Sequence, residues 1–169
     1  MGLWSQALAA WQDGRHDEAA RALEQLLAAT ADDLQARHLY GVVKVETGDY
    51  DEAIEQLQIV CRAEPANDQA LSNLGNVLRL AGKLAEAEIA LHSGLEHNPG
   101  NSSLHFNLGI VLNALKRARE AEAVFLRACE LDPDDQAAWL ELGQLRYARS
   151  DHLNAAAAFL RAAELDGEG

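Results

Sequence analysis

The chain has few of the residues typical of disulfide-rich, β-sheet or membrane-spanning proteins. Its 169 residues include two cysteines, three prolines and one methionine, and aromatic residues make up 5% of the total. Apolar residues are still ample, and alanine supplies much of that content. Because aromatic side chains favour strands and alanine favours helices, this composition disfavours a β protein. No apolar run approaches the ~20 residues of a membrane-spanning helix.

Basic residues are also scarce. There are 14 Lys and Arg against 27 Asp and Glu, which gives a net charge of −13 at pH 7, spread along the whole chain. Such a field repels phosphate backbones and anionic lipids, so we expect neither nucleic acid nor a membrane as partner. It favours neutral or cationic partners, or it serves solubility alone. No basic segment followed by a long apolar core begins the sequence, so we expect a cytoplasmic protein.

Residue patterns that carry chemistry are absent as well. The six histidines show no metal-ligand spacing, and there is no phosphate-binding glycine loop or nucleophile elbow. Acidic pairs such as Asp32-Asp33 and Asp134-Asp135 lie at expected helix starts, where they complement the helix dipole. We therefore expect no enzyme activity, no metal and no cofactor.

What the sequence does have is a pattern that returns every 34 residues. The recurring residues are Pro65, Pro99 and Pro133; Gly41, Gly75, Gly109 and Gly143; and Ala19, Ala53, Ala87, Ala121 and Ala155. Stacked helical hairpins explain this spacing, because each hairpin buries its apolar face against the next copy. Cys61 and Cys129 are two periods apart, which is too far for a disulfide, and we interpret both as small core residues.

Each repeat predicts two helices. In the copy that spans 68–101, apolar residues share one face of a first helix, Gly82 ends it, and Pro99 stops the second helix. The residue before each first helix can cap the free N–H groups of the first turn, and these residues are Asp33, Asn67, Asn101 and Asp135. The recurring mid-helix glycines should allow close approach of the second helix. The space beside them should be filled by Leu23, Leu57, Leu91, Phe125 and Phe159.

These features resemble the tetratricopeptide repeat family, whose signature runs Trp or Leu, Leu-Gly, Tyr or another apolar residue, Ala, Phe and Pro. The last repeat matches it at Trp139, Leu142, Gly143, Ala155 and Phe159. The resemblance implies an all-α fold, a right-handed superhelical solenoid of about five helical hairpins. It implies a single domain over 1–169, with repeats at about 1–33, 34–67, 68–101, 102–135 and 136–169.

Several positions depart from the signature. Lys116 and Ser150 replace the turn glycine, Lys44 and Arg146 stand where an apolar residue is usual, and Arg37 and His105 replace the bulky first anchor. We expect these departures to affect local packing and not the fold.

The resemblance also implies where a partner binds, because the first helices of such repeats line a concave groove. Residues opposite or beside the packed stripe of these helices are the candidate binding residues. They are Gln35, His38, Val42, Gln69, Asn73, Asn76, Arg79, Phe106, Asn107, Ile110, Asn113, Gln144 and Tyr147. Trp4 and Trp11, seven residues apart on the first helix, either anchor a partner or pack against a neighbouring helix.

Asn73 and Asn107 hold the same place in successive repeats, and an Asn side chain can bond both the C=O and the N–H of a peptide. The segments 72–78 and 107–109 resemble the asparagine ladder of O-linked N-acetylglucosamine transferase repeats, which implies backbone capture of protein substrates. The alternative is that these asparagines are only polar residues on a wet surface. The basic residues of a carboxylate clamp for chaperone C-termini are missing, so we do not expect that partner.

The expected function is that of a protein–protein interaction scaffold or adaptor that binds a peptide or partner protein in the groove. The alternative is a substrate-recognition arm of a larger enzyme, such as a glycosyltransferase or another transferase. Ala156, Leu160 and Ala163 of the last helix should face whatever follows them. We therefore expect either a longer protein or self-association through this end.

Overall fold

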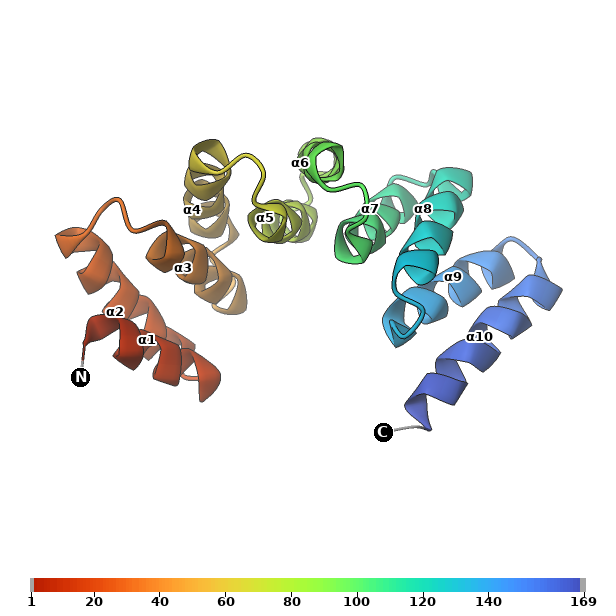
Figure 1. The fold of residues 1–169 in the computed structure, drawn as a ribbon, viewed down its shortest axis with the longest axis horizontal. Helices are drawn as coiled ribbons and strands as arrows, with labels where there is room; N and C mark the ends of the chain where they lie inside the picture. Colours follow the sequence, from red (N-terminus) through yellow and green to blue (C-terminus); the bar gives the residue numbers. More distant parts are fainter. Residues whose placement is uncertain (1, 168–169) are drawn as a thin grey trace. The chain divides into compact units, whose positions relative to one another are not determined.

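The computed structural model describes residues 2–167, and within this range it contains ten α-helices and no strand (Figure 1). The helices belong to two compact units, Met1–Lys83 and Leu84–Gly169. The first unit holds α1 (Leu3–Gln12), α2 (His16–Ala29), α3 (Leu34–Glu46), α4 (Tyr50–Ala63) and α5 (Asp68–Leu80). The second holds α6 (Leu84–His97), α7 (Ser102–Ala114), α8 (Ala118–Leu131), α9 (Gln136–Ala148) and α10 (His152–Asp166).

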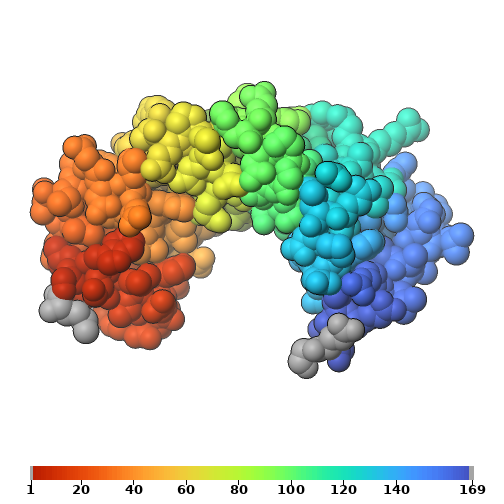
Figure 2. Space-filling model, viewed as in Figure 1, coloured from red at the N-terminus to blue at the C-terminus, as the bar shows by residue number. Residues whose placement is uncertain are grey.

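Within each unit, every helix packs on the next helix along the chain. The hairpins are α1 with α2, α3 with α4, α7 with α8, and α9 with α10. Helices α2 and α3, α4 and α5, α6 and α7, and α8 and α9 join one hairpin to the next, and the space-filling view shows the helices of each unit packed against one another (Figure 2). The expected order of two helices in each repeat is confirmed. The single domain stays a prediction, and Met1, Glu168 and Gly169 lie outside the described residues.

The four predicted helix caps are confirmed. The carboxylate or amide oxygen of each cap accepts a hydrogen bond from the backbone N–H three residues later, over distances of 3.0 Å, 2.9 Å, 3.0 Å and 3.1 Å at Asp33, Asn67, Asn101 and Asp135. Each cap contributes about 1 kcal/mol to the stability of its helix. These side chains therefore determine at which residue α3, α5, α7 and α9 each begin.

A second set of hydrogen bonds closes the connections between hairpins. Arg37 Nε donates to the carbonyl of Ala31 at 2.9 Å, His105 Nε2 donates to that of Pro99 at 3.0 Å, and Trp139 Nε1 donates to that of Pro133 at 2.9 Å. Each donor lies six residues after its acceptor, at the same place in three repeats. Arg37 and His105 thus keep the N–H donor that Trp139 supplies, although they replace the bulky anchor.

Three of the four predicted mid-helix glycines, Gly41, Gly109 and Gly143, meet the second helix of their hairpin, as the sequence predicts. A Cβ atom on Gly109 would lie 2.6 Å from the ring of Phe125, and one on Gly143 would lie 2.7 Å from the ring of Phe159. A Cβ on Gly41 would lie 2.8 Å from Leu57. Because real Cβ contacts are longer than this, each glycine sets how closely its two helices pack.

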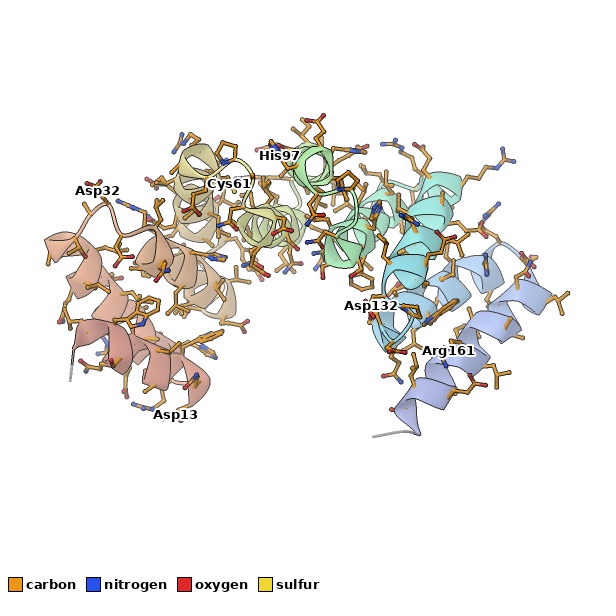
Figure 3. All side chains as sticks on the ribbon, viewed as in Figure 1. Asp13, Asp32, Cys61, His97, Asp132 and Arg161 are labelled. Atoms are coloured by element: carbon orange, nitrogen blue, oxygen red, sulfur yellow. The ribbon has the colours of Figure 1, made fainter. Side chains whose placement is uncertain are left out.

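The cysteines lie in different units and both are free thiols. Cys129 is buried, with 1% of its surface exposed, and Cys61 on α4 is half-buried (Figure 3). Burial raises the pKa of both thiols to about 11, so both are protonated at neutral pH. A protonated, buried thiol is unreactive, which fits the interpretation of both residues as core positions.

Lys44 and Arg146, the two charged residues at positions where an apolar residue is usual, form half-buried ion pairs. Lys44 Nζ lies 3.3 Å from Asp49 and 3.7 Å from Glu24, and it stands 5.1 Å from the centre of the Tyr40 ring. The Tyr40 hydroxyl donates to Glu24 at 2.7 Å, and its pKa is raised mainly by burial and then by this carboxylate. A carboxylate on α2 therefore binds two side chains of α3 and holds these helices together.

Arg146 on α9 is paired in the same manner. Its Nε donates to Glu122 of α8 at 2.9 Å, and Arg149 also bonds that carboxylate. The Arg146 and Glu122 side chains are 16% and 24% exposed, so the pair is largely removed from water. The expected disturbance of packing at Lys44 and Arg146 is thus compensated by a carboxylate on the preceding helix.

Lys116 and Ser150 adopt the backbone conformation of the glycines that they replace. Their φ angles are 64° and 66°, against 72°, 79° and 76° for the turn glycines Gly14, Gly48 and Gly82. This left-handed conformation costs a residue with a side chain about 1–2 kcal/mol, whereas glycine instead loses about 0.5–1 kcal/mol through chain entropy.

We expect Lys116→Gly to raise the free energy of unfolding by about 0.5–1 kcal/mol, because it removes the left-handed strain at the α7–α8 turn. Urea denaturation followed by circular dichroism measures this change. The matched control is Lys83→Gly, one residue after the glycine of the equivalent turn, which should not stabilise the protein. A lower denaturation midpoint for Lys116→Gly would contradict the prediction.

Candidate functional site

Three first helices of successive hairpins line one hollow in the first unit. Its volume is about 460 Å³. Helix α1 contributes Trp4 and Trp11, α3 contributes Gln35, His38, Leu39 and Val42, and α5 contributes Gln69 and Asn73. A hollow of this size, lined by apolar and aromatic side chains with a few polar groups, is typical of ligand sites.

The lining of this α1–α3–α5 hollow contains three polar side chains joined by hydrogen bonds. Asn73 Nδ2 lies 2.8 Å from His38 Nε2, and Gln69 Nε2 lies 3.4 Å from Asn73 Oδ1. Because an amide N–H only donates, His38 Nε2 is the acceptor and the imidazole is neutral. Burial of His38 lowers its pKa, against a smaller opposite effect of Glu64, and this favours the neutral ring. The chain of Gln69, Asn73 and His38 is therefore ordered and uncharged.

The lining of the α1–α3–α5 hollow carries no formal charge. Its eight residues include no Asp, Glu, Lys or Arg, and His38 is neutral. A charged side chain bound there would lose water without gaining an opposite charge. The hollow is therefore suited to a neutral, apolar side chain, with amide groups in its lining for a peptide backbone.

The structure brings together five of the predicted site residues in this hollow, namely Gln35, His38, Val42, Gln69 and Asn73. Asn76 and Arg79 lie further along α5, where Arg79 Nη2 donates to Asn76 Oδ1 at 2.9 Å. The remaining candidates are in the second unit, with Phe106, Asn107, Ile110 and Asn113 on α7 and with Gln144 and Tyr147 on α9.

In the second unit, the predicted site residues have different surroundings. Phe106 packs against the buried ring of Phe125, with ring centres 6.0 Å apart. Asn113 and Gln144 are exposed, and Ile110 and Asn107 are half-buried. Tyr147 stacks edge-on against His152 at 5.1 Å, in a separate hollow between α9 and α10.

For Trp4 and Trp11, the sequence left open whether they anchor a partner or pack against a neighbouring helix. Trp11 packs against the core of the first hairpins, and Trp4 is 36% exposed, yet both line the hollow. Their spacing of seven was the available signal, because it places both rings on one helix face. What the sequence alone does not give is that α3 and α5 turn apolar and amide side chains toward the same space.

Two other kinds of site are absent from the described part of the chain. No helix within residues 2–167 is both long and apolar enough to cross a membrane. Over the same residues, no group of three or more His, Cys, Asp or Glu side chains is arranged to hold a metal ion.

Comparison with known proteins identifies the repeat. A family model described as tetratricopeptide repeat matches residues 10–74 and 78–142, and a second model with the same description matches residues 119–169. None of the curated proteins compared with the chain matches it.

Solved structures share the fold over almost the whole chain. MamA from Desulfovibrio magneticus RS-1 is 21% identical, with a TM-score of 0.85 over 98% of this chain and 94% of that one. MamA AMB-1 is 27% identical, with a TM-score of 0.79 over 100% of both chains. PilF from Pseudomonas aeruginosa is 21% identical, with a TM-score of 0.85 over 96% of this chain and 74% of that one. The shared architecture is an all-α solenoid of tetratricopeptide repeats.

Proposed function

Because the chain belongs to the tetratricopeptide repeat family and is a protein-interaction scaffold, we propose that the α1–α3–α5 hollow is where a peptide segment of a partner protein binds. The observation that carries this proposal is the convergence of three first helices on one uncharged space of about 460 Å³. In a scaffold built from repeated hairpins, a surface shared by several helices can follow an extended chain over several residues.

The lining indicates how a peptide is held. An apolar side chain of the peptide inserts between Trp4, Trp11 and Val42, where its burial stabilises the complex by about 1.5–3 kcal/mol. Gln35 is exposed in the lining, and its amide offers a donor and an acceptor to the peptide backbone. Asn73 is already bonded to His38 and Gln69, so its preset orientation lowers the entropy that binding costs.

The test selects peptides from a random library displayed on phage and measures their affinity by fluorescence anisotropy. We expect Trp4→Ala and Asn73→Ala each to weaken a selected peptide about tenfold or more, with the helical circular dichroism spectrum unchanged. Ile89→Ala is the matched control, because this side chain is 71% exposed on α6 of the other unit. Peptides whose affinity is the same for the wild type and both hollow variants would overturn the proposal.

The finer predictions about the partner belong to this proposal. A neutral or cationic partner fits the net charge of −13. That the protein binds neither nucleic acid nor a membrane stays a prediction. A role as adaptor without catalysis, the similarity to O-linked N-acetylglucosamine transferase repeats and its asparagine ladder also stay predictions. A cytoplasmic location is a prediction too, and two free thiols fit a reducing compartment.

Self-association through α10 is the second interaction that we propose. Leu160 is 63% exposed, and Ala156 and Ala163 on the same helix face are exposed as well. Large apolar side chains grouped on one face mark protein contacts more often than isolated ones do.

A further inference from the structure

His38 on α3 is the one titratable side chain in the lining of the α1–α3–α5 hollow. The other lining residues are tryptophan, leucine, valine, glutamine and asparagine, whose side chains stay uncharged at every physiological pH. The ordinary pKa of a histidine lies close to physiological pH, so a small effect of the surroundings decides whether the ring is charged. The charge of the whole lining therefore depends on one proton at His38.

The neutral ring accepts a hydrogen bond that a protonated ring could not accept. Asn73 Nδ2 lies 2.8 Å from His38 Nε2, so the amide donates to the lone pair of that nitrogen. A proton on Nε2 would make this nitrogen a donor and place two donors against each other. Asn73 would then have to turn its carbonyl toward His38, and this would move away the oxygen to which Gln69 Nε2 donates at 3.4 Å. Protonation of His38 therefore disrupts the hydrogen-bonded order of the lining.

The charged groups near His38 do not stabilise a positive ring. Glu64, the residue that follows α4, favours the protonated ring, but Asn67 Nδ2 already donates to this carboxylate at 2.7 Å. The neighbouring cation on α3 is Arg37, whose Nη1 donates to Gln56 of α4 at 2.6 Å. Helices α1 and α5 contribute only uncharged side chains to the hollow. Burial lowers the pKa of His38 more than Glu64 raises it, so the ring is neutral at pH 7.

We propose that peptide binding in the hollow is coupled to the loss of a proton from His38, so that the hollow binds its peptide when the ring is neutral and releases it when the ring is charged. This proposal rests on the proposed function and specifies how that site is regulated. A bound apolar side chain would cover the half-buried ring and remove the water that stabilises a positive charge. Because the lining holds no carboxylate to replace that water, binding expels the proton.

Thermodynamic linkage gives the direction and the size of this effect. Covering the ring lowers the pKa of His38 further in the complex than in the free protein. Between these two pKa values, the complex binds fewer protons than the free chain does. The dissociation constant therefore rises as the pH falls, by up to about tenfold per pH unit. Above the pKa of the free protein, which burial holds below the ordinary histidine value, both states are neutral and the affinity is constant.

The coupling is specific to one repeat. His38 belongs to the second repeat, and the residues at the equivalent place of the next three are Ser72, Phe106 and Leu140. None of these side chains changes its charge near neutral pH. A pH-dependent affinity that disappears with His38 would therefore identify this hollow as the place where the peptide binds.

The first test examines the free protein. NMR of the ¹⁵N-labelled imidazoles distinguishes the two tautomers and follows the titration of each ring, and His38→Gln identifies the His38 signals. We expect the tautomer with its proton on Nδ1, since Nε2 accepts from Asn73, and a pKa below the ordinary histidine value. A proton on Nε2 at neutral pH, or a pKa at or above the ordinary value, would overturn the coupling and leave the proposed peptide site standing.

The second test measures affinity against pH. It uses a selected peptide whose binding is weakened by Trp4→Ala and which has blocked ends and no titratable side chain. The wild-type dissociation constant should rise by up to about tenfold per pH unit below the His38 pKa. His38→Gln offers Asn73 an amide oxygen but cannot titrate. Whatever the affinity of this variant at neutral pH, we expect it to change little as the pH falls. His97→Gln is the matched control, because His97 is exposed at the end of α6 in the other unit, and it should keep the wild-type pH dependence (Figure 3).

Calorimetry in two buffers of different ionisation enthalpy measures the proton itself. Within the pH range where the affinity changes, the wild type should release up to about one proton per bound peptide, and His38→Gln should release almost none. A peptide that depends on Trp4 but binds with the same affinity and no proton release at every pH would overturn the coupling and leave the peptide site intact. Selected peptides that Trp4→Ala and Asn73→Ala do not weaken would overturn both.

Discussion

Phe125→Ala is expected to lower the free energy of unfolding by about 4 kcal/mol, the largest single effect that we anticipate. The Phe125 side chain is fully buried, and it covers the backbone of Gly109 on the neighbouring helix. It also contacts the ring of Phe106, with centres 6.0 Å apart. Because Gly109 has no side chain to move into the vacated space, the cavity stays open and its full cost is felt.

The opposite change tests the same contact from the other helix. Gly109→Ala places a Cβ atom 2.6 Å from the Phe125 ring, and forcing the helices apart should cost about 1–3 kcal/mol. When both substitutions are combined, the alanine at 109 no longer meets a ring, so the loss should be smaller than the sum of the two.

Urea denaturation followed by circular dichroism provides these values. Gly100→Ala is the control for the added methyl group, because its Cβ would meet nothing closer than the Asn98 side chain at 3.7 Å. Additive losses in the Phe125 and Gly109 double variant would show that the two residues do not share one contact.

Glu122→Ala is expected to have the second largest effect, a loss of about 2 kcal/mol. It leaves the guanidinium of Arg146, whose side chain is 16% exposed, without the carboxylate that accepts its hydrogen bond at 2.9 Å. Removing one partner of a fully buried pair costs about 3–5 kcal/mol, and the partial access of water to Arg146 reduces that figure here.

The pair itself should contribute little beyond what apolar residues would supply. The double variant Glu122→Leu with Arg146→Leu restores the apolar residue that is usual at position 146, so its stability should return close to that of the wild type. Glu130→Ala is the control, because its pair with Arg127 is half exposed and its loss should hardly move the denaturation midpoint. A double variant less stable than Glu122→Ala would mean that the ion pair is required for α8 to pack on α9.

The features that were predictable from the sequence are those decided over a few residues or by the repeat. A cap such as Asp33 accepts a hydrogen bond from an N–H three residues away. Its residue type and its place before an apolar stripe are therefore sufficient to predict it. The close approach at Gly109 was predictable because the repeat places Phe125 at the same offset as Leu57 in an earlier copy. The all-α solenoid follows from such local agreement.

The features that were not predictable depend on contacts between hairpins. Nothing near Arg146 in the sequence identifies Glu122, which is 24 residues away on the preceding helix. Tyr147 has the spacing of a groove residue, but a turn brings His152 against its ring. Likewise, the hollow exists because α1, α3 and α5 converge, and a pattern on one helix does not give the position of another.

The hydrogen bonds that join one hairpin to the next have a consequence for how such a chain can change its length over evolution. Both the cap at Asp135 and the bond from Trp139 to Pro133 are completed within a stretch of seven residues. A whole 34-residue segment that is duplicated or deleted therefore includes its own donors and acceptors, so no hydrogen-bonding group is left without a partner at the new junction. Adding a single residue between Pro133 and Trp139 would break that closure, so growth by complete copies is tolerated where growth by single residues is not.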